Sequence, residues 1–115
     1  MHRQSTSPRF TQLRHGLLEF VVLTRIDSRE GGFYAKELLD DLEKTEFATP
    51  KGTLYPLLAK IKRENLVVQS REESEECTPR KFYYLTPKGK HLLRGYRIYW
   101  KIINNAMRKL RQRPT

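Results

Sequence analysis

Residues 49–65 read TPKGTLYPLLAKIKREN, and their hydrophobic pattern is the starting point for predicting the fold. Its apolar side chains recur at three- and four-residue spacing, at Leu54, Leu57, Leu58 and Ile61. This period predicts a helix that has one buried face and ends near Asn65. Thr49 followed by a proline is typical of a helix start, but Pro56 then loses a backbone hydrogen bond in the second turn. A start at Thr53 would avoid this loss, so both starts remain open.

Two further helices are expected before this stretch. The first begins near Leu13, and its apolar stripe comprises Leu17, Leu18, Val21, Val22 and Ile26. Gly31 and Gly32 then break the chain. A shorter helix follows, with apolar positions at Ala35, Leu38, Leu39 and Leu42. Residues 1–12 contain almost nothing to bury, so we expect them to form a flexible basic arm.

After Asn65 the hydrophobic period changes from that of a helix to that of a strand. Residues 66–70 and 81–85 have strand composition and polar residues between them, which predicts a hairpin. Three helices followed by a hairpin is the order of a winged helix-turn-helix domain, expected here over residues 13–86 in a mainly α (α+β) fold. The tip carries Glu72, Glu73, Glu75 and Glu76. These carboxylates either bend away from phosphates or form a solvated loop.

Thr86 and Pro87 open a last helix that we expect to run to about Arg111, with residues 87–115 forming a dimerisation helix and a basic tail. Its apolar side chains follow a heptad pattern: Leu92, Tyr96, Tyr99, Ile103, Ala106 and Leu110, with Trp100 and Met107 alongside. A helix of about 24 residues spans about 36 Å, more than a domain of this size can cover. Part of the stripe is therefore expected to pack against a second copy of the chain. The alternative is packing against the first helix.

The chain of 115 residues is strongly basic, with 23 Lys and Arg against 13 Asp and Glu and a net charge of +10. The surplus is uneven, because residues 77–115 hold 11 basic and no acidic side chains. Phosphates suit such a surface, since each neutralised phosphate releases a condensed counterion. This distribution favours a polyanion as the partner, and the alternative is a tail that only aids solubility. Together with the helix-turn-helix order, it leads us to expect double-stranded DNA.

No constellation in the sequence indicates catalysis, a cofactor or a metal. Cys77 is the only cysteine, which excludes an internal disulfide and a cysteine-based metal cage. The histidines are too far apart to suggest a metal motif: His2, His15 and His91. No stretch is long and apolar enough for a membrane helix, and the first residues lack the apolar run of a signal peptide. We therefore expect a cytoplasmic protein that is not an enzyme.

Three segments resemble the PadR family of transcriptional regulators: GTLYPLL at residues 52–58, LVV at residues 66–68 and RKFYYLTPKG at residues 80–89. The resemblance extends from Leu13 to about Leu110, in the family's order and spacing. It implies a winged-helix domain, a homodimer formed through the last helix, and repression by binding to an inverted-repeat operator. Asn65 stands where the family often has glycine, and Ser70 lies in the early wing, where many members have a tryptophan.

The candidate DNA-binding residues lie around the second and third helices and on the wing. They are Tyr34, Lys36, Thr49, Lys51, Thr53, Tyr55, Pro56, Lys60, Arg63, Arg80 and Lys81. Helical spacing places four of them opposite the apolar face of the third helix, namely Thr53, Pro56, Lys60 and Arg63. The resemblance assigns groove contacts to Thr53, Tyr55 and Pro56. It assigns wing contacts to Arg80 and Lys81.

The aromatic residues of the last helix carry a further expectation. Resemblance to multidrug-responsive family members implies that Tyr96, Tyr99 and Trp100 line a pocket between the subunits for a planar aromatic effector. The alternative is that these rings only pack the seam. Two rival functions also stay open: a protein-interaction module that docks through the winged helix, and a nonspecific nucleic-acid binder that depends on the basic tail.

Overall fold

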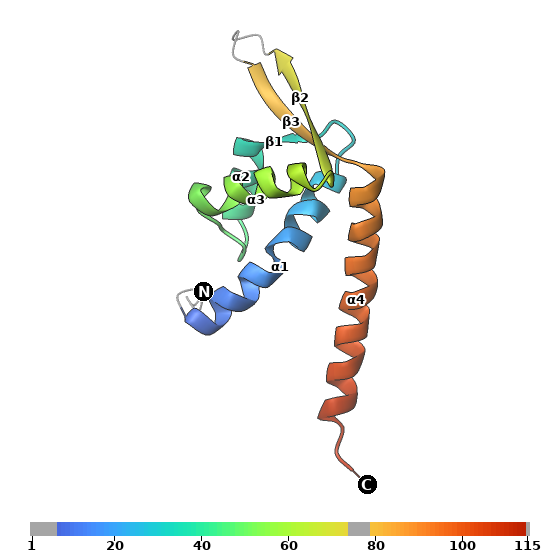
Figure 1. Ribbon diagram of the computed structural model, residues 1–115. Helices are drawn as coiled ribbons and strands as arrows, with labels where there is room; N and C mark the ends of the chain where they lie inside the picture. The colour runs from blue at the N-terminus through green and yellow to red at the C-terminus, as the bar shows by residue number, and fades with distance from the viewer. Residues whose placement is uncertain (1–6, 74–78, 115) are drawn as a thin grey trace.

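The structure is a computed structural model that describes residues 7–73 and 79–114. Four helices and a small antiparallel sheet follow one another in the order of a winged helix-turn-helix (Figure 1). The elements are α1 (Pro8–Asp27), β1 (Phe33–Tyr34), α2 (Ala35–Glu43), α3 (Lys51–Arg63), β2 (Val67–Glu73), β3 (Pro79–Leu85) and α4 (Pro87–Arg111). This order confirms the predicted fold class.

The third helix, α3, begins at Lys51, between the two predicted starts. Pro56 lies inside the helix and cannot donate a backbone hydrogen bond there. The helix ends where the sequence predicts, because Asn65 has a φ of 63° and asparagine tolerates this left-handed conformation. The amide of Leu66 donates to the carbonyl of Ile61 at 2.9 Å, which closes the helix end and leads the chain into β2.

The sheet has the order β1-β3-β2, with β3 in the middle and both pairings antiparallel. The β2–β3 hairpin is the wing, and it is longer than predicted because backbone pairing continues outward to Glu73 and Pro79. Polar side chains do not end such a ladder, since its bonds join backbone groups. The two-residue strand β1 was not predicted. The expected acidic tip lies largely outside the described residues, as does Cys77.

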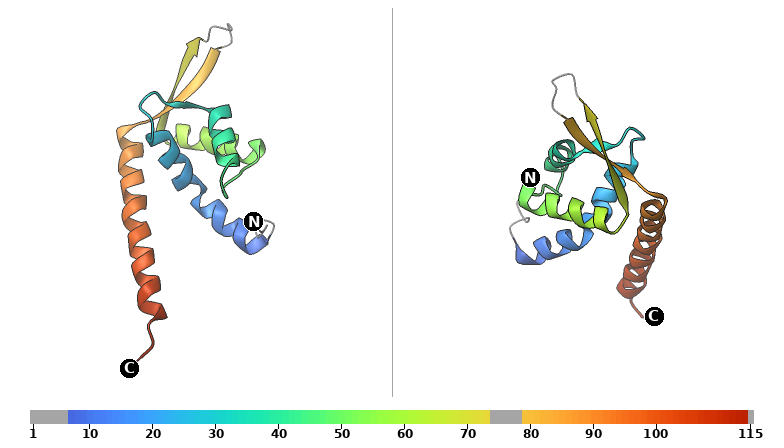
Figure 2. Two further views of the ribbon diagram at one scale, coloured as in Figure 1. Left: turned by 180° about the vertical axis from the view of Figure 1, so that it is seen from behind. Right: turned by 45° about the horizontal axis from the view of Figure 1, so that its top comes forward.

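One apolar core lies where α1, α2, α3, the sheet and the start of α4 meet. Its buried members are Leu18, Val22, Leu23, Ile26, Phe33, Leu38, Leu42, Leu54, Leu58, Ile61, Leu66, Val67, Tyr83 and Leu93. Among the residues that the structure describes, no polar or charged residue is buried in it. Only the first turns of α4 touch this core, and the rest of the helix extends away from the domain (Figure 2).

The first helix starts at Pro8, so the expectation that residues 8–12 belong to a flexible arm is wrong. Proline suits the first helical position because its φ is already fixed near the helical value. The amide of Thr11 donates to the carbonyl of Ser7 at 2.9 Å, which is the first hydrogen bond of the helix. The remainder of the expected arm, residues 1–6, lies outside the described part of the chain.

The start of α4 is fixed to the end of α3. The Thr86 hydroxyl accepts a hydrogen bond from the amide of Gly89 at 2.9 Å and donates to the carbonyl of Asn65 at 2.7 Å. Gly89 is buried against this junction, and a Cβ atom placed there would lie 2.1 Å from the carbonyl oxygen of Leu66. A side chain at this position would therefore push α4 away from the domain.

We predict that Gly89→Ala lowers the free energy of unfolding by about 1–3 kcal/mol, the usual cost of overpacking a filled site. Gly95→Ala is the matched control, because the same helix carries this glycine and a Cβ there meets nothing within 4 Å. It should leave the stability unchanged or raise it by up to about 1 kcal/mol through better helix propensity. Urea unfolding followed by circular dichroism measures both. Equal stability of the two variants would contradict the described junction.

Candidate nucleic-acid interface

The recognition face of α3 is defined by what the core leaves exposed. Leu54, Leu58 and Ile61 are buried, so the opposite side of the helix faces outward. Tyr55, Pro56 and Arg63 are exposed on or beside that side, and Lys51 is exposed at the first residue of the helix. α3 itself contains no acidic residue. The arrangement offers a phenol, an apolar ring and cations to a partner with phosphates and base edges.

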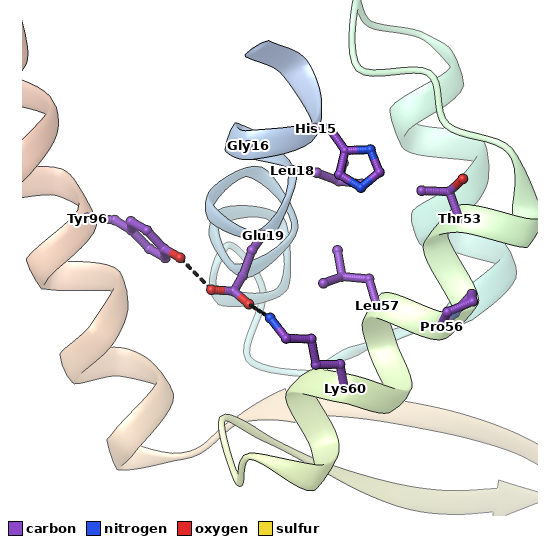
Figure 3. A pocket seen from close by; sticks show the side chains of 9 residues that line it. All are labelled: His15, Gly16, Leu18, Glu19, Thr53, Pro56, Leu57, Lys60 and Tyr96. Atoms are coloured by element: carbon purple, nitrogen blue, oxygen red, sulfur yellow. Dashed lines mark hydrogen bonds and ion pairs between the residues drawn. The ribbon is translucent and has the colours of Figure 1, made fainter. Parts of the chain in front are cut away.

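Two of the predicted outward residues lie instead on the side that α1 flanks. Thr53 is half-buried and, together with His15 and Leu18, lines a cavity of about 450 Å³. The Lys60 ammonium lies 3.4 Å from a carboxylate oxygen of Glu19 on α1 (Figure 3). Thr53 is thus only partly exposed, whereas Lys60 is exposed as expected but is paired with Glu19. The exposed Pro56 borders the same cavity. The periodicity of one helix cannot show that another helix runs along its flank.

The wing contributes a cation that is held by an aromatic side chain. The Arg80 guanidinium lies 4.7 Å from the centre of the ring of Tyr34, which is the residue before α2. The Tyr34 ring in turn meets Phe82 edge-on, with 5.5 Å between ring centres. Stacking of this kind orients the positive charge of the guanidinium. The predicted residues Tyr34 and Arg80 therefore form one unit, and Lys81 beside them is exposed.

The other predicted residues around α2 and α3 have local partners. Lys36 is exposed and its ammonium donates to Asp40 at 2.8 Å, which raises the pKa of Lys36. The hydroxyl of Thr49 donates to the backbone carbonyl of Phe47 at 2.6 Å. Thr49 therefore shapes the loop before α3.

The inner side of α4 packs on α1 of the same chain. Tyr96 stacks on Phe20 with 5.1 Å between ring centres, and Trp100 meets the same ring edge-on at 6.3 Å. The Tyr96 hydroxyl donates to Glu19. Burial raises the pKa of Tyr96, and the hydrogen bond to Glu19 and the charge of that carboxylate raise it further. Tyr96 and the half-buried Leu92 thus make contacts within the protomer. This is the alternative of packing against the first helix, which the sequence analysis left open.

The outer side of α4 is a second apolar surface. Its exposed members are Ile98, Tyr99, Ile102 and Leu110, of which Leu110 is 81% exposed. The predicted residues Ile103 and Ala106 lie beside them. The exposed Met107 lies further along the side that carries Tyr96 and Trp100. The heptad analysis missed Ile98 and Ile102, although their four-residue spacing was a signal. Near the start of α1, Phe10 and Leu13 are also exposed.

The structure brings the predicted effector residues only partly together. Tyr96 lines the cavity between α1, α3 and α4, whereas Tyr99 is 60% exposed on the outer side of α4. Sequence reasoning missed Glu19, whose side chain reaches both Tyr96 and Lys60. The signal for Glu19 was an acidic residue set between Leu18 and Phe20 in an apolar stripe.

Residues 7–73 and 79–114 contain neither a cluster of metal ligands nor a membrane-spanning helix. No group of three or more His, Cys, Asp or Glu side chains there is placed to hold a metal ion. None of the helices in this part of the chain has the length and apolar character required to cross a membrane.

Several solved structures share this fold. A PadR-like transcription factor from Bacteroides fragilis is 31% identical with a TM-score of 0.75, and the match covers 87% of this chain and 95% of that one. A PadR-like transcriptional regulator from Bacillus cereus is 29% identical with a TM-score of 0.78, covering 90% and 99%. A PadR family transcriptional regulator from Eggerthella lenta is 25% identical with a TM-score of 0.80, covering 94% and 93%.

No functionally curated protein matches the sequence. The sequence profile of the transcriptional regulator PadR-like family matches residues 22–95, which run from the middle of α1 into α4. This match confirms the resemblance found in the sequence, and the family comprises DNA-binding regulators and not enzymes. The chain therefore belongs to the PadR-like family of transcriptional regulators.

Proposed function

We propose that the chain is a homodimeric repressor that binds an inverted-repeat operator through α3 and the wing. The observation that carries this proposal is the exposed face of α3, where Tyr55, Pro56 and Arg63 lie opposite the buried leucines. A helix that presents hydroxyl, apolar and cationic groups together matches the mixed chemistry of a major groove. Repression follows if the bound dimer covers the site where transcription begins.

The wing and the helix ends supply phosphate contacts in this proposal. Arg80 stacked on Tyr34, the exposed Lys81 and the exposed Lys51 add positive charge on either side of α3. Such contacts hold the protein in register on the duplex, whereas base-edge contacts select the sequence. We assign Tyr55 and Arg63 to the base edges or to the phosphates beside them. Lys36 and Thr49, which have partners within the chain, are assigned to the margin of the interface.

We predict that Tyr55→Ala combined with Arg63→Ala weakens binding to a duplex selected from a random DNA pool by at least about tenfold. The reason is that each good base contact contributes about 1–3 kcal/mol. Arg94→Ala, which removes an exposed cation from α4, is the matched control and should change affinity little. Titration by fluorescence anisotropy at two salt concentrations measures the effect.

The same titration separates the rival functions. A sequence-specific repressor keeps its affinity for the selected duplex when scrambled duplex is added. Equal competition by scrambled duplex would support the nonspecific binder. Absence of salt-dependent binding to either duplex would support the protein-interaction module, because phosphate contacts make DNA binding depend on salt.

The dimer rests on the outer side of α4. This helix has 25 residues and is about 37 Å long, yet only its first two turns enter the core. Ile102 is 54% exposed in a row with other large apolar side chains, a surface that a soluble monomer rarely shows. A second copy arranged about a two-fold axis would cover both rows at once. The exposed Phe10 and Leu13 on α1 would extend the interface.

We predict that Ile102→Asp raises the dimer dissociation constant by about 100-fold, because it removes an apolar contact and places a charge in the interface. Asn104→Asp is the matched control, since it adds the same charge to an exposed position on another face of α4. Sedimentation velocity across a range of concentrations measures the mass. A monomeric wild-type protein at micromolar concentration would contradict the dimer.

An effector site between the subunits is the last part of the proposal. Trp100 meets Phe20 with one edge but is still 42% exposed, and Tyr99 is 60% exposed on the outer side of α4, so a dimer formed through this helix could enclose flat aromatic surfaces. A planar aromatic compound could stack between them and shift the two recognition helices.

We predict saturable quenching of Trp100 fluorescence by planar aromatic compounds, together with release of the selected duplex. Trp100 is the only tryptophan of the chain, so the signal reports this site. No quenching across a varied panel, with DNA binding unchanged, would support a repressor without an effector.

A further inference from the structure

One carboxylate joins three helices at the centre of the protomer. Glu19 projects from α1, and its side chain is 18% exposed. On one side it accepts a hydrogen bond from the Tyr96 hydroxyl of α4, and on the other side its second oxygen lies 3.4 Å from the Lys60 ammonium of α3 (Figure 3). The dimerisation helix and the recognition helix are therefore connected through a single residue.

The space between these three helices is a pocket that opens to solvent and is not filled by side chains. The cavity of about 450 Å³ is lined by residues of α1, α3 and α4, among them Leu57, Lys60 and Tyr96. Close packing normally fixes the distance between helices, and a cavity removes such contacts. The polar chain from Tyr96 through Glu19 to Lys60 crosses beside this space. It therefore contributes more to the spacing of α3 and α4 than it would in a filled core.

Tyr96 and Lys60, the two partners of Glu19, each make a further contact. Tyr96 stacks on Phe20 at 5.1 Å, and the raised pKa of Tyr96 keeps its hydroxyl protonated, so that it remains a donor. Lys60 lies 3.9 Å from Glu64, a second carboxylate just beyond α3. A shift of α4 against α1 would thus change the place of Glu19, and with it the place of Lys60 on α3.

We propose that Glu19 is the positioning residue through which α4 sets the orientation of the recognition helix α3. This inference rests on the proposed function, because it assumes that α3 reads DNA. Glu19 does not itself touch DNA in this account. It acts through Lys60, whose ion pair with Glu19 holds α3 in place. Lys60 need not contact a base itself.

The positioning role and the change in net charge predict opposite effects of Glu19→Gln on operator affinity. Glu19→Gln removes a negative charge from a DNA-binding protein, and charge alone would tighten binding to every duplex. A positioning role requires the reverse for the operator, since a misplaced α3 loses base contacts. Nonspecific duplex depends on phosphate contacts and should bind with equal or higher affinity.

The test uses the full chain, a duplex selected from a random DNA pool with the wild-type protein, and a scrambled duplex of the same length. We expect Glu19→Gln to weaken binding to the selected duplex about three- to tenfold, the effect of losing one ordinary net hydrogen bond. Glu46→Gln is the matched control, because it removes an exposed carboxylate from the loop between α2 and α3. It should not weaken binding to either duplex.

Tyr96→Phe provides a second variant that keeps the ring on Phe20 and changes no charge. We expect it to weaken operator binding in the same direction, and the double variant Glu19→Gln with Tyr96→Phe to be no weaker than Glu19→Gln alone, because both act through one carboxylate. Circular dichroism and sedimentation establish that each variant is folded and dimeric. If Glu19→Gln does not fold, Tyr96→Phe carries the test.

Three outcomes separate the claims. Loss of operator affinity with scrambled-duplex affinity kept supports the positioning role. Tighter or unchanged operator binding by Glu19→Gln or Tyr96→Phe overturns it and leaves the repressor proposal intact. A wild-type protein that does not prefer its selected duplex overturns the proposed function itself, before any variant is compared.

Discussion

Most of the C-terminal helix extends beyond the apolar core of the domain, and the rest of the molecule depends on this feature. Its first turns are held by Leu93 in the core and by the Thr86 cap against the end of α3. Beyond them, one side of α4 rests on α1 and the other side exposes a row of large apolar residues. Apolar surface of this extent requires cover. In the proposed dimer a second copy would provide this cover, and it would also set the distance between the two α3 helices.

The first helix has the most varied role within the protomer. It supplies core residues such as Val22 and Leu23, and it carries Phe20 and Glu19 towards α4. Because α1 lies between α3 and α4 (Figure 1), a change at the proposed dimer interface would reach the proposed DNA-binding face through α1. Lys60 shows the consequence: a cation on the recognition helix is directed to α1 rather than left free for DNA.

Much of this arrangement follows from the sequence, and the exceptions have physical reasons. The hydrophobic period of residues 49–65 predicts which face of α3 is buried. The length of α4 predicts that its own chain cannot cover all of its apolar side chains. The side-chain directions of Thr53 and Lys60 could not be predicted, because helical periodicity separates core from surface but does not locate a neighbouring helix. Residues 8–12 looked too polar to order, yet Pro8 favours a helix start at that point. The pairing of Tyr34 with Arg80 joins positions 46 residues apart and is fixed only by the tertiary fold.

Selection of bound sequences from a random DNA pool tests the central claim most directly, because one readout reports specificity, symmetry and spacing together. A dimer that holds two α3 helices about a two-fold axis should enrich an inverted repeat whose half-sites lie about one helical turn apart, roughly 10 base pairs. Enrichment of single half-sites, or of no sequence at all, would contradict the account.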